Sequence, residues 1–266
     1  MRSIGEIPRQ RLQKIRYLLT DVDDTMTQNG LLPAASLSAV EGLERAGIGV
    51  VPITGRPAGW CDHVARMWSV RAVVGENGAL YFSYDRVKHR MNQFFVKDEN
   101  ERRADRVRLD QIRARILREV PGAGIASDQR YRVADLAIDF CEDVDRLSDD
   151  EIASIVRVFE EHGATAKISS IHVNGWFGAY DKLTTTRTCM RTLFDVDIDK
   201  DNELIAYIGD SPNDSPMFAF FINSVGVANV ADFTMPVQPK WITAGRSARG
   251  FAEFAELLLE SRTERR

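Results

Sequence analysis

The sequence predicts an α/β fold in which a parallel sheet is interrupted by an inserted α+β unit. Apolar runs of strand length alternate with amphipathic helical patterns up to about Tyr81. Between Tyr81 and Tyr180 this alternation is lost, and strand-like runs come next to one another or at mixed spacing. The alternation resumes after Lys182. We therefore expect both ends of the chain to form one core and its middle to form a separate unit.

The core elements before the insertion are expected from short apolar runs and from helix start and stop signals. Strands are expected at 15–20, 48–53 and 72–74, where the chain is mostly apolar. The first helix is expected to begin near Pro33 and Ser36 and to end at Gly47, and the second contains Trp60 and Val64. After the insertion, we expect helices at 184–194 and 250–259, a short helix from Pro212, and strands at 204–208, 222–227 and 241–243.

The middle of the chain is predicted to combine a hairpin, two helices and further strands. The hairpin is expected over 81–95, the helices over 101–119 and 148–162, and the strands over 136–141 and 167–173. Seven arginines lie between Arg102 and Arg118, beside Asp105, Asp110 and Glu119. A solvated, salt-bridged helix face is favoured over a nucleic-acid site for such a mixed run.

The composition is that of a globular protein without an obvious polyanionic partner. A hydrophobic fraction of 44% in 266 residues is enough to bury a substantial core. The net charge of -4 gives no reason to expect nucleic acid. No run reaches the ~20 apolar residues of a membrane span, and the basic N-terminal stretch lacks a signal-peptide apolar block. Three scattered cysteines fit a reducing compartment, so a cytoplasmic protein that is a monomer or a small homo-oligomer is expected.

The strongest chemical signal is the acidic run Asp21-Val22-Asp23-Asp24-Thr25, which follows the first strand directly. Ligands of open α/β sheets gather at the carboxyl ends of strands. If this segment is extended, Asp21 and Asp23 point to the same side. Paired carboxylates attract a hard cation such as Mg²⁺, and one can attack phosphorus while the other transfers protons. The alternative is that the run only forms a turn or a cap.

Three further segments follow predicted strands or begin a helix in the same way. Thr54 offers a hydroxyl and nearby backbone N–H groups to a phosphate, although it would also serve as a helix N-cap. Lys182 offers an ammonium group at a strand-to-helix transition, although most lysines lie on the surface. The segment 209–214, Gly-Asp-Ser-Pro-Asn-Asp, gathers two carboxylates and an amide in one turn.

Together, these four segments resemble the signature motifs of the haloacid dehalogenase-like superfamily. The matching residues are Asp21, Asp23 and Thr25 of DxDxT, Thr54, Lys182, and Asp210, Asn213 and Asp214 of GDxxND. One departure is Leu183, because glycine commonly follows the family's lysine. The resemblance implies a Rossmann-like parallel sheet as the core and an inserted α+β cap. The core would span 1–84 and 181–266, and the cap 85–180, like the type IIB cap of Cof-like and sucrose-phosphatase-like members. Those members also carry a turn like Asn77-Gly78-Ala79.

The resemblance also implies roles for individual residues. Asp21 would be the nucleophile and Asp23 the general acid/base, with Thr54 and Lys182 completing the catalytic set. Mg²⁺ would be bound by the Asp21 carboxylate, the Asp23 backbone carbonyl and Asp210, with Asp214 supporting them. The expected substrate-binding residues are Thr54, Gly55, Arg56, Lys182 and Asn213 in the core and His172 and Asn174 in the cap. Trp176, Arg130 and Arg132 are further cap candidates, for which ordinary structural roles remain the alternative.

We expect a Mg²⁺-dependent phosphatase acting on a small phosphorylated metabolite, such as a sugar phosphate or a phosphorylated sugar-acid conjugate. Two alternatives stay open. A phosphomutase would share the aspartyl-phosphate and return the phosphoryl group to its substrate. A phosphate-ligand-binding protein on the same scaffold would need no positioned acid/base, which Asp23 supplies.

Overall fold

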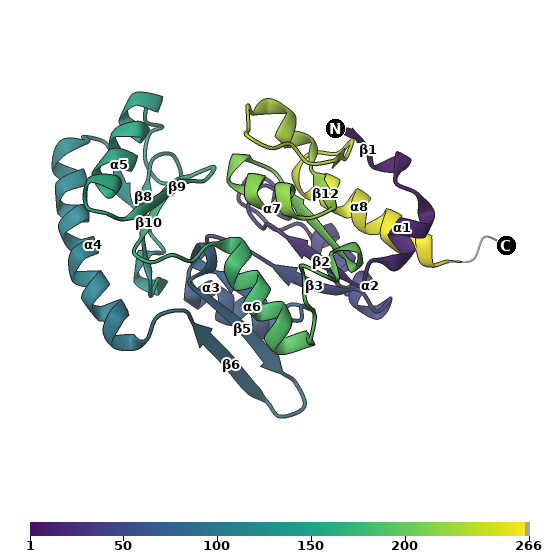
Figure 1. Cartoon of the computed structure of the whole chain (residues 1–266). Helices are drawn as coiled ribbons and strands as arrows, with labels where there is room; N and C mark the ends of the chain where they lie inside the picture. Colours follow the sequence, from purple (N-terminus) through teal and green to yellow (C-terminus); the bar gives the residue numbers. More distant parts are fainter. Residues whose placement is uncertain (264–266) are drawn as a thin grey trace.

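The computed structural model describes residues 1–263 and contains a six-stranded parallel sheet, which we call the core sheet (Figure 1). Its strand order is β1-β13-β12-β11-β2-β3. The strands are β1 (Arg2–Ser3), β2 (Tyr17–Thr20), β3 (Gly49–Pro52), β11 (Ile205–Gly209), β12 (Asn223–Gly226) and β13 (Trp241–Ile242). The predicted α/β class and parallel core are thereby confirmed.

Alternate residues of the central strands enter two different hydrophobic clusters, one on each face of the core sheet. Leu18 and Val50 pack with α1 (Arg9–Lys14), α2 (Ala34–Arg45) and α8 (Ser247–Arg262). Their neighbours Leu19 and Val51 pack with α6 (Lys182–Phe194) and α7 (Ser215–Phe220) on the opposite face. This explains the continuous apolar runs in the sequence, because a strand covered on both sides has no polar face.

A three-stranded sheet lies beside the core sheet and carries the predicted hairpin. It joins β4 (Val73–Gly75), β5 (Leu80–Asp85) and β6 (Arg90–Phe95) in antiparallel fashion, and α3 (Ala58–Met67) packs on it. The expected strand at 72–74 therefore forms, but it pairs with β5 in this second sheet and is not a member of the core sheet. A single parallel bridge between Ile53 and Val74 connects the two sheets.

The cap sheet is a separate four-stranded antiparallel sheet with the order β7-β8-β10-β9. Its strands are β7 (Gly124–Ile125), β8 (Asp135–Asp139), β9 (Thr165–Ile168) and β10 (His172–Trp176). Two helices, α4 (Glu99–Glu119) and α5 (Asp149–Glu161), cover one face and share a hydrophobic cluster with Leu136, Ile138 and Val173. We call this sheet with its two helices the cap. The basic helix is salt-bridged as expected, for example between Arg103 and Glu99.

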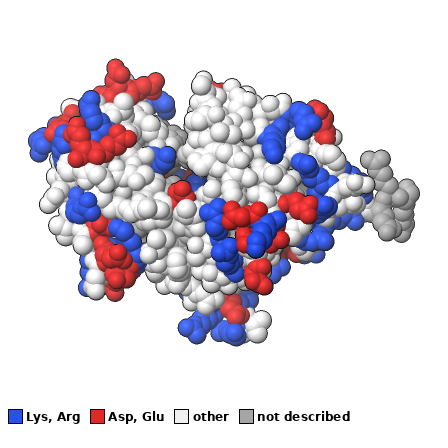
Figure 2. All heavy atoms as spheres, viewed as in Figure 1, with Lys and Arg blue, Asp and Glu red and all other residues white. Residues whose placement is uncertain are grey.

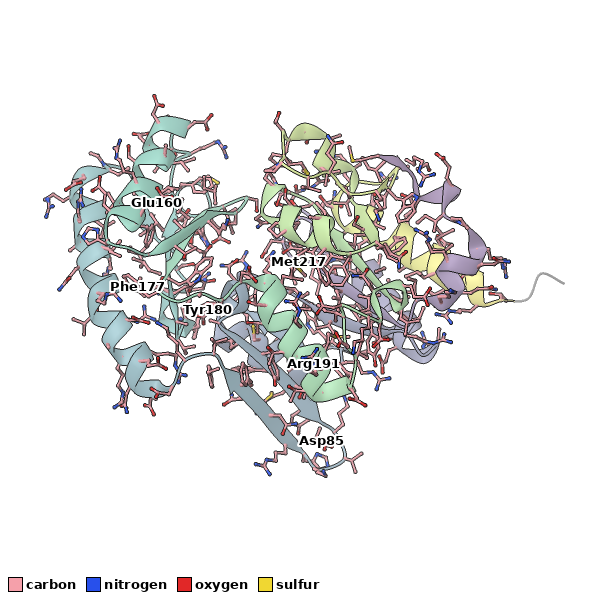
Figure 3. The ribbon with its side chains drawn as sticks, in the orientation of Figure 1. Asp85, Glu160, Phe177, Tyr180, Arg191 and Met217 are labelled. Carbon is pink, nitrogen blue, oxygen red and sulfur yellow. The ribbon has the colours of Figure 1, made fainter. Side chains whose placement is uncertain are left out.

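The other face of the cap sheet is polar and lies toward the core. Strand alternation places His172, Asn174 and Trp176 on the face opposite to Val173. Figure 3 shows Tyr180 at the point where the chain returns from the cap to α6, and there Trp176 stacks on Tyr180. The cap sheet and its helices lie within the expected insertion, whose bounds at 85 and 180 stay a prediction.

Some elements differ from those predicted. The single strand expected over 167–173 is wrong: the chain turns at 169–171, so that β9 and β10 form a hairpin. The turn has neither glycine nor proline, and the Ser169 side chain closes it by accepting from the N–H of His172 at 3.0 Å. The elements β1, α1 and β7 were not predicted, because runs of two to six residues give little periodicity. Within residues 1–263, no helix is both long and apolar enough to cross a bilayer.

Glu76 connects the core to the cap through backbone hydrogen bonds. Its fully buried carboxylate accepts from the N–H of Ala58 at 2.9 Å, of Val133 at 2.9 Å and of Ala134 at 2.7 Å. Ala58 begins α3, whereas Val133 and Ala134 lead into β8 of the cap. Burial, together with the charge of Asp135, raises the pKa of Glu76 to about 7. One carboxylate therefore satisfies donors from both parts of the chain.

We predict that Glu76→Gln lowers the free energy of unfolding by about 2–4 kcal/mol. The amide keeps one acceptor oxygen but turns an NH₂ group toward backbone donors, which leaves buried N–H groups unpaired. Glu203→Gln is the control, because the exposed pair of Glu203 with Lys14 is worth at most about 1 kcal/mol. Denaturant unfolding of both variants measures the difference, and equal stabilities would show that Glu76 does not hold the two parts together.

Candidate active site

Three of the predicted motifs meet at one edge of the core sheet because their strands are neighbours. Asp21 follows β2, Thr54 lies two residues beyond β3, and Asp210 follows β11. The strands are parallel and adjacent in the order β11-β2-β3, so their carboxyl ends lie side by side. Asp21 and Asp23 line the same cavity, although the chain turns after Val22 instead of staying extended.

Lys182 reaches this edge from the first residue of α6. Its Nζ lies 2.7 Å from Asp21 Oδ1 and 3.2 Å from Asp214 Oδ1. Asp181 caps the helix by accepting from the Thr184 N–H at 2.7 Å. The helix therefore begins at Lys182 even though leucine, and not glycine, follows at position 183. Burial lowers the Lys182 pKa, but the two carboxylates outweigh it and raise that pKa above its ordinary value. Lys182 is therefore a fixed cation in this structure.

Asp214 is held by donors from β11 and from the turn that follows it. Its Oδ1 accepts from the Tyr207 hydroxyl at 2.5 Å, and its Oδ2 accepts from the Asp210 N–H at 3.0 Å. Gly209 is required here, because a Cβ would lie 2.4 Å from Asp214 Oδ2. These contacts explain the spacing of the turn, since Asp214 folds back on the strand end and fixes the direction of Asp210.

Three buried carboxylates cluster beside the Lys182 ammonium group, which contacts two of them, so their charge is only partly compensated. Ligand oxygens of Asp21, Asp210 and Asp214 all lie within 4.8 Å of one another. Burial raises the pKa of Asp21 to about 8, against the opposing effect of Lys182, and Asp214 and Asp23 raise it further. Burial raises the pKa of Asp210 as well, and the charges of Asp214, Asp21 and Asp24 add to this effect. A cluster of hard oxygen ligands with excess negative charge fits a divalent cation such as Mg²⁺.

The remaining core residues predicted to bind substrate surround the same cavity. Gly55, Arg56 and Asn213 line it directly. The Thr54 hydroxyl accepts from the Arg56 N–H at 3.0 Å, so it also closes the turn after β3. Asn213 accepts from the Ser211 hydroxyl at 3.1 Å. The expected core residues are therefore brought together.

Arg56 joins the core to two carboxylates of the cap. Its Nε lies 3.0 Å and 3.1 Å from the two oxygens of Asp23. Its Nη2 lies 3.2 Å from Glu142 and its Nη1 3.5 Å from Asp128. The guanidinium also lies over the ring of Trp60, 4.5 Å from its centre. The orientation of Asp23 therefore depends on Arg56, and that of Arg56 depends on the cap.

Glu142 is a cap residue that the sequence did not single out. Its Oε2 lies 2.9 Å from His172 Nε2, and this close contact with His172, together with Arg56, lowers the pKa of Glu142 to about 2. Asp139 fixes the turn that carries it by accepting from the N–H groups of residues 141, 142 and 143 at 2.9, 2.7 and 2.8 Å. The only sequence signal was an acidic pair after a strand, which is common in turns.

The other cap candidates take different positions. His172 and Asn174 line the cavity, and Asn174 donates to Asp135 Oδ2 at 2.9 Å. Arg132 also lines it but is buried and pairs with Asp128 and Asp135 while donating to Gly55 O at 2.8 Å. Arg130 is exposed beside Tyr131, and the Trp176 indole donates to Tyr180 O. Among the arginine candidates, Arg132 connects the cap to the loop after β3.

The cavity between the cap and the core is small. Figure 2 shows a recess between the two parts of the molecule, with charged side chains visible in it. The inner cavity has a volume of about 30 Å³. That is room for about two or three water molecules. We therefore expect the cap to move away from the core when a phosphate ester binds at Asp21.

Solved structures with the same architecture identify the fold. The protein 0175 of Thermoplasma acidophilum is 18% identical, with a TM-score of 0.67 over 91% of this chain and 99% of its own. A haloacid dehalogenase-like hydrolase from Bacteroides thetaiotaomicron is 14% identical, with a TM-score of 0.62 over 91% and 98%. A trehalose-6-phosphate phosphatase related protein is 12% identical, with a TM-score of 0.61 over 92% and 97%. No protein-family model and no curated protein matches the sequence.

The chain therefore has the haloacid dehalogenase-like fold, as the four motifs predicted. The likeness covers the core and the cap together, because more than nine-tenths of each chain is aligned.

We predict that Mg²⁺ raises the midpoint of thermal unfolding, because the cation neutralises the cluster only in the folded chain. At a concentration a hundred times Kd the gain is about 2.7 kcal/mol. Asp210→Asn should lose the Mg²⁺-dependent increase and, without metal, should unfold at a higher temperature than the wild type, since one repelling carboxylate is gone. Asp199→Asn, which alters an exposed pair with Arg187, should keep the increase. A wild-type midpoint that does not respond to Mg²⁺ or EDTA would exclude the metal site.

Proposed function

We propose that this protein is a Mg²⁺-dependent phosphatase that hydrolyses a small phosphomonoester through an aspartyl-phosphate intermediate. The observation that carries the proposal is the contact of 2.7 Å between Lys182 and Asp21 inside a cluster of three buried carboxylates. Such a site suits phosphoryl transfer, where positioning and charge neutralisation supply most of the catalysis. The fold shared with a phosphatase-related protein supports the same reaction class.

Asp21 is the proposed nucleophile. One carboxylate oxygen attacks phosphorus, the P–O bond to the leaving group breaks, and the phosphoryl group remains on Asp21 as an acyl phosphate. Lys182 stays protonated beside it, so it reduces the repulsion between the carboxylate and the anionic ester. A water molecule then attacks phosphorus and releases inorganic phosphate, which regenerates the carboxylate.

Asp23 is the proposed general acid/base. It gives a proton to the leaving oxygen in the first step and takes one from the attacking water in the second. Asp23 lines the cavity together with Asp21, and Arg56 holds both of its carboxylate oxygens. Its position is therefore fixed when the cap is against the core, because Glu142 and Asp128 hold Arg56 in turn.

The proposed metal site uses the carboxylates of Asp21, Asp210 and Asp214 and the backbone carbonyl of Asp23. Bound Mg²⁺ would neutralise the developing charge on the transferring group. Thr54, Gly55, Arg56, Lys182 and Asn213 form the proposed phosphate-binding set in the core. Each of them lies at or beside the cavity or in contact with Asp21.

We propose that the substrate is a sugar phosphate or a phosphorylated sugar-acid conjugate. The cap presents a polar face to the cavity, where His172 and Asn174 offer an imidazole and an amide suited to hydroxyl groups. In this proposal residues 1–84 and 181–266 form the catalytic core and 85–180 the specificity cap. The cytoplasmic location and the state of monomer or small homo-oligomer also remain predictions.

We predict that the purified protein releases inorganic phosphate from an aryl phosphate in the presence of Mg²⁺ and not with EDTA. Asp21→Asn should reduce turnover to background because the amide is not a nucleophile. Asp199→Asn serves as the control with unchanged turnover, because its side chain is exposed and pairs only with Arg187 among the contacts above. Metal-dependent binding without turnover across aryl, sugar and nucleotide phosphates would favour the phosphate-binding alternative. Transfer between two sugar positions would favour the phosphomutase.

Asp23→Asn separates the acid/base role from simple binding in the same assay. Sugar phosphates have a poor leaving group that needs a proton, whereas activated aryl phosphates leave without one. We therefore expect kcat for a sugar phosphate to fall by about 10²–10⁴-fold. The rate constant of the first step with the aryl ester, measured as release of the aryl alcohol, should fall far less. Equal losses for both substrates would contradict the proposed role of Asp23.

A further inference from the structure

Asn77 lies in an unusual turn between β4 and β5, beside the proposed active site. Two successive residues that are not glycine, Glu76 and Asn77, have positive φ values of 45° and 54°. Each such residue costs about 1–3 kcal/mol and persists only where its surroundings impose the conformation. Asparagine tolerates this conformation better than most residues, but glycine would tolerate it at no steric cost. Backbone conformation alone therefore does not explain why the position carries a carboxamide.

Contacts from three directions impose this turn. The Glu76 carboxylate ties it to α3 and to the cap, as described above. The Asn77 N–H donates to Thr54 O at 3.2 Å, and the Thr185 hydroxyl of α6 donates to Gly78 O at 2.5 Å. Gly78 lies so close to α6 that a Cβ would be 2.1 Å from Asp181 O. The position of Asn77 is therefore fixed by the same elements that carry Thr54 and Lys182.

The carboxamide of Asn77 is buried, but its NH₂ group has no partner. The residue is 9% exposed, and Nδ2 makes no hydrogen bond to any residue between 1 and 263. An unpaired buried donor is costly, so native proteins rarely keep one without a reason. The amide lies against Gly55, where an added Cβ would be 3.2 Å from both Nδ2 and Oδ1. An unused donor thus stands beside the loop that is proposed to bind phosphate.

Two cavities meet at this side chain. One is the inner cavity, which Asn77 lines together with Asp21, Gly55 and Asn213. The other, of about 90 Å³, is lined by Asn77 with Lys182 and Asn213. Asp21 lines the inner cavity and Lys182 lines the second one, and the two side chains are in contact at 2.7 Å. A phosphoryl group on Asp21 and beside Lys182 would therefore lie in a space that this amide also lines.

We propose that Asn77 is a substrate-binding residue whose side-chain NH₂ group donates to a non-bridging oxygen of the phosphoryl group. This inference rests on the proposed function. The strained turn holds this donor in place before substrate binds, so no reorganisation is needed at the moment of reaction. The ligand it recognises is the phosphoryl group itself, common to all esters and to inorganic phosphate, and not the leaving group.

Asn77→Gly tests this role without a general loss of stability. Glycine adopts the positive φ freely and removes the unpaired donor, so the unfolding midpoint should stay within a few degrees of the wild type. We expect kcat/KM to fall about 10–100-fold for aryl and sugar phosphates alike, because one donor to the transferring group is lost. Asn77→Ala should lose activity similarly but unfold at a lower temperature, since alanine keeps the strained φ.

Asn29→Gly is the matched control. Asn29 is exposed, has a φ of 51° and does not line the inner cavity, so the same exchange should leave kcat/KM unchanged. Activity of Asn77→Gly within about twofold of the wild type would show that the residue only forms the turn. A loss confined to sugar phosphates would assign the amide to the leaving group and overturn the proposal.

Calorimetric binding of inorganic phosphate separates this inference from the proposed function. Phosphate should bind Asn77→Gly at least about tenfold more weakly than it binds the wild type, because a tenfold change corresponds to about 1.4 kcal/mol and one hydrogen bond to a charged group is worth about that or more. This measurement needs no turnover. If the wild type binds phosphate but hydrolyses no ester, the enzyme proposal fails while a weakened Asn77→Gly still supports the donor. Equal phosphate affinities would overturn the donor whatever the activity.

Discussion

The ammonium group of Lys182 inside a cluster of buried carboxylates is the interaction on which the site depends. Without it, Asp21 and Asp214 would repel each other in a region closed to water. Removing one partner from a buried ion pair typically costs about 3–5 kcal/mol, because the remaining charge is uncompensated. The single positive charge of Lys182 does not neutralise three carboxylates. We therefore expect a divalent cation to be bound at the site when the protein is active. The fold supplies the constraint, since the adjacent parallel strands β2 and β11 end at one edge and place Asp21 beside the turn that carries Asp210 and Asp214, while α6 begins there with Lys182.

Ion pairs and hydrogen bonds of two arginines join the cap to the core. Arg56 and Arg132 each contact groups from both parts: Arg56 binds Asp23 and Glu142, and Arg132 binds Asp135 and the Gly55 carbonyl. Cap position and the orientation of Asp23 are therefore coupled. If the cap moves away to admit a substrate, Arg56 loses its cap partners. Its return would hold Asp23, the proposed acid/base, in place and keep bulk water away from the site.

Much of this could be predicted from the sequence, for identifiable physical reasons. The central strands were predictable because both of their faces are buried, and Asp21, Thr54, Lys182 and Asp210 were predictable because they stand where such strands or a helix begin or end. The hairpin turn at 169–171 was missed because its two serines carry no strong turn signal. Glu76, Glu142 and Asn77 were not identified as parts of the site because the groups they contact, or adjoin, lie far away in the sequence. Pairing of that kind becomes visible only in three dimensions.

The most direct measurement of the central claim is to trap the covalent intermediate. Rapid quenching during turnover of a phosphate ester, followed by borohydride reduction, converts an aspartyl phosphate into homoserine, which peptide mass spectrometry locates. The account predicts homoserine at position 21, dependent on Mg²⁺ and strongly reduced in Lys182→Met, because that variant loses the cation nearest to Asp21. Phosphate release with an unmodified Asp21, or with the label on another residue, would contradict it.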